Sequence, residues 1–428
     1  MKNLILLFVA CAALSCKQDN KLAGTTIDNP AYDIYLTTSQ RPTYEAALEQ
    51  KEFWSNKMRS DSSSAGVLAP LASVYSTLFD QTGDASYLSI AEQLLEKGRM
   101  VSANQKDSYG HGLAKNYISQ HRFKEARDLL ETIYNEPSNK QNTELMLFDV
   151  YMELGNYVKA DTMLGKVKNN RDYNYLIRLA KWSDYRGDLD AAINYLEQAK
   201  DIAEASGKKT LMIWTYSNIA DFYGHAGRIE DSYNHYMKTL SLEPDNAYAK
   251  KGIAWIKYSK EQDTKEANRI LDAVMVHHKV PDYHLLKAEM ASYDGDEEEA
   301  AKQEQLFLEA VEKGSYGEMY NTYLIELLVN SDPKKALALA TAEVSNRATP
   351  ETYHLLAYAQ LKNKEPEAAL TTIRDHVEGK TFEPMAQYHS ALVYKANRLE
   401  EKVILIKEEL MEASFELGPL LAQEILEL

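Results

Sequence analysis

Hydrophobic residues recur along this chain with helical spacing, and short side chains mark a longer period. Between Tyr216 and Pro244, apolar positions three or four residues apart form two runs separated by a turn at Gly227. A short side chain returns at one place in the second run of ten successive copies, at intervals of 32 to 40 residues. The chain is therefore predicted to be an array of repeats. The ten positions are Ala91, Ala126, Ala160, Ala192, Ser232, Ala267, Ala300, Ala336, Ala369 and Val403.

Each repeat is predicted to be a pair of antiparallel helices that cross closely. Small side chains are needed where two helix backbones approach, while Tyr, Phe and Leu fill the space to the next unit. One such pair cannot bury its apolar face alone, so the pairs must stack, each against its neighbours. The pattern predicts a solenoid rather than a domain with one central core.

The repeat resembles the tetratricopeptide repeat. Its clearest copy places Ala220, Tyr223, Gly227, Ser232 and a closing Pro244 in the order of that family's pattern. The resemblance implies an all-α fold, a right-handed superhelical solenoid of about ten helix–turn–helix repeats over residues 63–403. A capping helix is predicted over residues 43–62. Helices over residues 404–428 are predicted to cover the exposed apolar face of the tenth repeat.

Composition agrees with a folded protein and disfavours one class of partner. The chain has 428 residues, of which 45% are hydrophobic and 26% charged, unlike a disordered segment. Length alone would predict two or three globular domains, but a solenoid of this length can be one continuous stack. The net charge of −16 and the lack of a basic stripe argue against nucleic-acid binding.

The first fifteen residues have the pattern of a secretory signal peptide. A lysine at position 2 precedes an apolar run, residues 4–14, that is too short to span a bilayer. The segment ending at Cys16, Ala-Leu-Ser-Cys, resembles a bacterial lipobox, whose cysteine receives a diacylglyceryl group before cleavage. The mature chain is therefore predicted to begin at a lipidated Cys16. Lipidation at Cys11 and an ordinary signal peptide without lipid stay open as alternatives.

Residues 16–42 are predicted to be a flexible tether, because they carry no helical apolar stripe. Lys17 stands where the resemblance to enterobacterial lipoproteins puts an inner-membrane retention aspartate, which favours the outer membrane. Residues 17–20 also resemble the export tag of surface lipoproteins of the Bacteroidota. The predicted location is the cell envelope, as an outer-membrane lipoprotein on the periplasmic face or the cell surface.

In the tetratricopeptide superhelix, the first helix of each repeat lines the concave face. Aromatic residues gather in the middle of the groove that this resemblance implies, and such side chains dominate binding hot spots. The alternative interpretation is that several of them pack between helices. The predicted partner-binding residues are His111, Lys115, Tyr185, Trp214, Asp221, His225, Tyr248, Lys251, Trp255, Tyr258, Tyr293, His354, Tyr358 and Tyr388.

No catalytic, cofactor or metal site is predicted. The acidic run at residues 294–299 lacks the ligand spacing of an EF-hand, and the histidines at 277, 278 and 284 do not form a His-Glu-x-x-His motif. Nucleophile-elbow, phosphate-loop and dinucleotide-binding motifs are also missing from the sequence. The protein is therefore expected not to be an enzyme.

The sequence favours a lipid-anchored envelope scaffold that binds a protein or peptide partner in the concave groove. A first alternative is a nutrient-uptake lipoprotein of the outer membrane that binds glycan through exposed aromatics. A second is a hydrolase whose site carries no recognisable motif.

Overall fold

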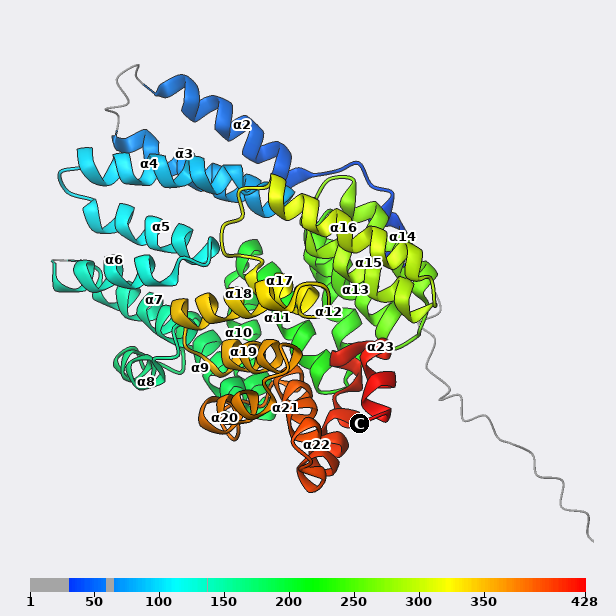
Figure 1. Cartoon of the computed structure of the whole chain (residues 1–428). Coiled ribbons are helices and arrows are strands. Elements are labelled where there is room, and N and C mark those ends of the chain that lie inside the picture. The colour runs from blue at the N-terminus through cyan, green and yellow to red at the C-terminus, as the bar shows by residue number, and fades with distance from the viewer. Residues whose placement is uncertain (1–30, 59–64, 137) are drawn as a thin grey trace, which may run out of the picture.

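The computed structural model describes residues 31–58, 65–136 and 138–428, and within them all regular secondary structure is helical. Twenty of these helices form ten consecutive packed pairs, which stack as the predicted right-handed solenoid (Figure 1). The pairs are α3 (Ala65–Thr82) with α4 (Ser86–Val101), α5 (Lys106–Ser119) with α6 (Phe123–Asn135), α7 (Lys140–Glu153) with α8 (Tyr157–Lys166), α9 (Tyr173–Tyr185) with α10 (Leu189–Ser206), α11 (Lys209–His225) with α12 (Ile229–Leu242), α13 (Ala247–Ser259) with α14 (Thr264–Met275), α15 (Asp282–Tyr293) with α16 (Glu297–Lys313), α17 (Asn321–Ser331) with α18 (Pro333–Asn346), α19 (Pro350–Lys362) with α20 (Pro366–His376), and α21 (Pro384–Ala396) with α22 (Glu400–Glu412).

The periodic short side chains lie where the helices of each pair cross. All ten of them, from Ala91 to Val403, are buried, and none is more than 3% exposed. A larger side chain at such a position would push the two backbones apart, because the interior is close-packed. The periodicity therefore predicted the ten repeats correctly.

The superhelix folds back so that distant repeats touch. The backbone N–H of Lys279 donates to the carbonyl of Thr82 over 2.9 Å, which joins the sixth repeat to the first. Near the third repeat, Gly155 adopts a φ of 68°, and a Cβ added there would lie 2.4 Å from the carbonyl oxygen of Ala348. The side chain of Arg347 also reaches Glu153 at 3.7 Å. These contacts close the superhelix partly on itself, so that the concave groove becomes a half-open interior.

The predicted tether is wrong over its last part, and residues 16–30 lie outside the described residues. Residues 31–41 pack along the outer surface of the stack and include a short helix, α1 (Asp33–Leu36). Tyr32 is 3% exposed, and its hydroxyl donates to Glu266 over 2.7 Å. Asp33 pairs with Arg269, and Arg41 donates to the carbonyl of Gln81. Buried aromatic area and ion pairs therefore fix this segment to α14 and α3.

A single helix follows residues 31–41 and covers the first repeat. This helix, α2 (Pro42–Lys57), packs along α3, while residues 59–64 lie outside the part of the chain that the structure describes. Ala47 of α2 is buried together with Val74 and Leu78 of α3. The signal peptide predicted at residues 1–15 and the lipidated Cys16 also lie outside the described residues.

The last helix, α23 (Ser414–Leu426), contradicts the simple capping role predicted for residues 404–428. Its second part does cover the tenth repeat, where Ile425 is buried with Tyr388 and Leu410, as is Leu417 from the first part. Its first part instead contacts the fifth to seventh repeats, because Phe415 lies against Gly224 of α11 and accepts from Trp255 of α13, and Gly418 lies against Glu289 of α15. The end of the chain therefore forms part of the interior wall.

Candidate functional site

Two adjoining cavities occupy the interior of the superhelix. The first, called here the acidic cavity, has a volume of about 410 Å³ and lies between the third to fifth repeats and the eighth to tenth. The second, called here the central cavity, has a volume of about 700 Å³ and is lined by α11, α12, α13, α15, α17 and α23. His225 and Glu416 line both, so the two cavities share one wall.

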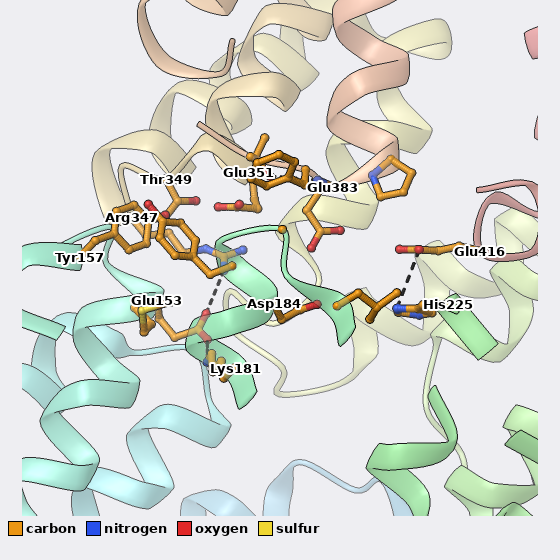
Figure 2. A pocket seen from close by; sticks show the side chains of 17 residues that line it. Glu153, Tyr157, Lys181, Asp184, His225, Arg347, Thr349, Glu351, Glu383 and Glu416 are labelled. Carbon is orange, nitrogen blue, oxygen red and sulfur yellow. Dashed lines mark hydrogen bonds and ion pairs between the residues drawn. The ribbon is translucent and has the colours of Figure 1, made fainter. Parts of the chain in front are cut away.

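Carboxylates from four elements face the acidic cavity. Asp184 ends α9, Glu351 begins α19, Glu383 precedes α21 and Glu416 belongs to α23 (Figure 2). Enclosure in the cavity raises the pKa of Glu383, and the charges of Glu416, Asp184 and Glu351 raise it further, although its side chain stays open to the cavity. The cavity therefore concentrates negative charge.

The opposite wall of the acidic cavity carries a compensated ion network. Glu153 accepts from Lys181 Nζ over 2.8 Å and lies 3.7 Å from Arg347 (Figure 2). Burial opposes ionisation of Glu153, but the two cations outweigh it and lower the pKa of that carboxyl. The stacked rings of Tyr157 and Tyr185, 4.1 Å apart, stand beside this network. Glu153 is therefore neutralised within the fold.

The central cavity combines aromatic rings with partly satisfied carboxylates. Asp221 accepts hydrogen bonds from the hydroxyls of Tyr236 and Tyr248, and Lys251 pairs with Asp282 at 2.7 Å. Burial raises the pKa of Asp221, and the two hydroxyls partly offset that effect.

Two glutamates in the same cavity have strongly raised pKa values. Burial raises the pKa of both Glu289 and Glu326 to about 7. Close to neutral pH these two side chains therefore alternate between protonated and charged forms. An ionised glutamate is costly in this setting, because few dipoles replace the water it has lost.

Several predicted groove residues do reach the interior. Lys251, Trp255, Asp221 and His225 line the central cavity, and Tyr185 lines the acidic cavity. Trp214 is 40% exposed and lines a neighbouring cavity of about 470 Å³ together with Asp184 and Lys181. Tyr248 is 52% exposed beside Asp221, and Lys115 is exposed on α5.

Other predicted groove residues pack between helices, as the alternative interpretation held. His111 is buried and hydrogen-bonds Thr143 over 2.8 Å, and Tyr258 is fully buried with Tyr293 against its ring. His354 is buried, with its Nδ1 2.8 Å from Nδ1 of His389. The prediction that these three buried side chains line the groove is wrong, because adjacent first helices lie close enough to enclose them. Two more of the predicted groove residues also have partners within the fold. The ring of Tyr358 stacks on His389, and the hydroxyl of Tyr388 donates to Glu424.

The repeat register missed the residues that come from outside the first helices. Glu383 lies in an inter-repeat loop, Arg347 ends a second helix, and Phe415 and Glu416 belong to the C-terminal helix. A fixed offset within each repeat cannot find them. A sequence signal for the last two does exist, since the Gly418-Pro419 pair marks a break within the final helix.

In the described part of the chain, clusters of three or more histidine, cysteine or carboxylate side chains that could hold a metal ion are not found. Among the described helices, none combines the length and the apolar character that crossing a bilayer requires.

Comparison with known proteins relates the chain to solved structures only. No model of a known protein family matches the sequence, and no curated protein matches it. A tetratricopeptide repeat protein from Parabacteroides merdae is 14% identical, covers 67% of this chain and 99% of its own, and has a TM-score of 0.41. Yeast Tom70 is 15% identical over 87% of this chain and 94% of its own, with a TM-score of 0.40. YrrB, described as a repeat protein with an unusual peptide-binding site, is 16% identical over 46% and 96%, with a TM-score of 0.28.

Proposed function

We propose that this chain is a non-enzymatic scaffold of the cell envelope that holds a segment of a protein partner inside its superhelix. The observation that carries this proposal is a set of partly exposed aromatic side chains in or next to the interior cavities. Trp214, Tyr248 and Tyr323 are 40%, 52% and 40% exposed. Trp214 stands beside Asp184, Tyr248 donates to Asp221, and the charge of Lys251 acts on Tyr323.

Open aromatic rings in a concave site favour binding of a protein segment. Such rings offer a large contact area and lose little conformational entropy when they are covered. The backbone around them is held by α11, α13 and α17, so the site exists before a partner arrives, which lowers the cost of binding.

Capture from detergent-solubilised envelope tests this proposal. The bait is the full chain, and the interior variant is Trp214→Ala/Tyr248→Ala. The matched control is Phe53→Ala, which removes a ring that is 49% exposed on α2, on the outer surface. We expect the interior variant to lose its specific partner by at least tenfold and the control to retain it. Equal recovery with all three baits would refute the interior as the binding site.

The envelope location is the second part of the proposal and rests on the lipobox-like segment at Cys16. Lipidation there would attach the chain to a membrane and keep the solenoid outside the cytoplasm. Replacement Cys16→Ala is expected to move the protein from the membrane fraction to the soluble fraction. Cys11→Ala serves as the control and should leave the distribution unchanged. Membrane association that survives Cys16→Ala and disappears with Cys11→Ala would reassign the anchor.

A further inference from the structure

The chain places part of its own C-terminus in the central cavity. This inserted segment, residues 414–419, forms the first part of α23 and is set off by Gly418, whose φ of 81° and ψ of 163° are not helical. The rest of α23 is held on the tenth repeat, where Tyr388 donates to Glu424 over 2.6 Å. The inserted segment therefore lies in the central cavity as a ligand would, and the rest of α23 connects it to the tenth repeat.

A backbone carbonyl joins the inserted segment to the predicted groove. The carbonyl of Phe415 would accept from the backbone N–H four residues later in a continuous helix, but that residue is Pro419, which has no N–H. Instead it accepts from Trp255 Nε1 over 3.0 Å and from Ser259 Oγ over 2.6 Å. The groove thus supplies the hydrogen-bond donors that the segment lacks because of Pro419.

Two glycines allow the inserted segment and the groove to approach each other closely. A Cβ added to Gly224 would lie 2.7 Å from the ring of Phe415. A Cβ added to Gly418 would lie 2.7 Å from Glu289 Oε1 and 3.0 Å from the ring of Trp255. The inserted segment therefore fits the shape of the cavity.

The charge of the inserted segment fits the cavity less well than its shape does. Glu416 points into the wall that the two cavities share, 3.8 Å from His225 but also within the field of Asp184 and Glu383 (Figure 2). Burial raises the pKa of Glu416, and Asp184 raises it further against the effect of His225. A cation at this place would be attracted by the carboxylates of Asp184 and Glu383, which repel that of Glu416.

We propose that residues 414–419 occupy the partner's binding site in cis, and that the partner segment carries an aromatic residue followed by lysine or arginine. The aromatic ring would take the place of Phe415, and the cation would take the place of Glu416 near Asp184 and Glu383. A segment with this chemistry binds better than the inserted segment and displaces it. This inference rests on the proposed function, because it names the chemistry of the partner that the interior holds.

The first test changes the charge of the inserted segment within the full chain. Glu416→Lys is expected to dock more tightly, so hydrogen exchange of residues 411–428 should slow at least threefold. Glu412→Lys makes the same charge change at an exposed position at the end of α22 and should leave that exchange unchanged. Faster exchange in Glu416→Lys than in the wild type would overturn the proposed preference for a cation.

The second test frees the site and supplies the segment as a peptide. Gly418→Ala should release residues 414–419, because the new Cβ is strained at φ 81° and collides with Glu289 and Trp255. Gly207→Ala is the matched control, since Gly207 also has a positive φ, of 62°, but nothing lies within 4 Å of the added Cβ. Hydrogen exchange in the second to fourth repeats checks that the stack itself stays folded.

The probe is a labelled peptide of residues 411–421 in which Glu416 is replaced by lysine. We expect it to bind the Gly418→Ala chain at least tenfold more tightly than the unmodified peptide does, and at least tenfold more tightly than it binds the Gly207→Ala chain. Equal binding of the two peptides would overturn the charge preference, and equal binding to the two chains would overturn occupation in cis. Neither assay requires the partner, so failure to capture an envelope protein would count against the proposed function alone.

Discussion

The two ends of the described chain are both fixed to distant repeats, but on opposite faces of the superhelix. Residues 31–41 run along the outer surface and attach to α14 through Tyr32 and Asp33. The inserted segment at the other end enters the interior and attaches to α13 through the carbonyl of Phe415. One end covers an edge of the stack, whereas the other occupies the site that the repeats form.

The two contacts also differ in how well their charges are compensated. At the outer end, charges are compensated: Arg269 pairs with Glu266 and Asp33, and the hydrogen bonds from Arg269 and Tyr32 lower the pKa of Glu266 against the effect of burial. At the inner end, the carboxyls of Glu289 and Glu416 are half-buried without a full complement of cations, and their pKa values rise. Satisfied charges suit a permanent contact, and unsatisfied ones suit a contact that a better ligand replaces.

The largest difference between the two ends should appear when an aromatic anchor is removed. Tyr32→Ala deletes a ring that is 3% exposed and stands edge-on to Tyr233, so we expect a loss of about 3 kcal/mol in the free energy of unfolding, from urea titration followed by circular dichroism. Ile34→Ala, at a position that is 65% exposed, is the control and should change stability by less than about 0.5 kcal/mol. A loss below about 1 kcal/mol for Tyr32→Ala would mean that the outer end is not a structural anchor.

The sequence predicted the repeats because their determinants are local. A close crossing of two neighbouring helices requires a short side chain, and Ala126 or Ala267 satisfies that requirement within one repeat. The same locality explains why the groove register placed Asp221 and Lys251 correctly on the interior. Their surroundings come from the fifth to seventh repeats, which are adjacent in the stack.

The sequence did not predict contacts between residues that are far apart in the chain. Tyr32 and Glu266 are 234 positions apart, and Trp255 and Phe415 are 160 apart. No repeat period relates such pairs, because they depend on how far the superhelix winds before it meets itself. Curvature sums small rotations over many repeats, so it is a property of the whole stack. The occupied interior and the fixed N-terminal segment were both missed for this reason.

A second, smaller difference concerns pH, and the two ends should respond with opposite signs. Glu289 lies under the inserted segment, beside Tyr258 and near Glu424, and burial raises its pKa to about 7 from the ordinary 4.5. Its contribution to docking is therefore fully present below pH 4.5 and is lost as the pH rises through 7. We expect the docking equilibrium of residues 414–419 to fall roughly tenfold between pH 6 and pH 8.

Exchange protection of residues 411–428, corrected for the intrinsic exchange rate at each pH, measures this fall. Glu289→Gln should reduce the dependence without abolishing it, because the pKa of Glu416 is raised as well, while Glu408→Gln on the exposed face of α22 should leave it unchanged. The outer end behaves in the opposite way. The pKa of Glu266 is lowered, so its contribution is present above pH 4.5 and is lost only as the pH falls below that value. Loosening of both ends over the same pH range would contradict the distinction drawn between them.

The smallest expected effects come from single hydrogen bonds, and they test whether the carbonyl of Phe415 matters to docking. Trp255→Phe leaves Ser259 as a donor, and Ser259→Ala leaves Trp255, so each change should weaken docking by about 0.5 kcal/mol. The double variant leaves the carbonyl without a donor, since Pro419 offers none. Its cost should exceed the sum of the two single costs, because a buried acceptor is then left unsatisfied. At the outer end, Tyr32→Phe leaves Glu266 paired with Arg269 and should cost about 1 kcal/mol on its own. Additive costs at Trp255 and Ser259, measured by exchange protection of residues 411–428, would show that the carbonyl finds water in the central cavity and that packing of Phe415 alone holds the segment in place.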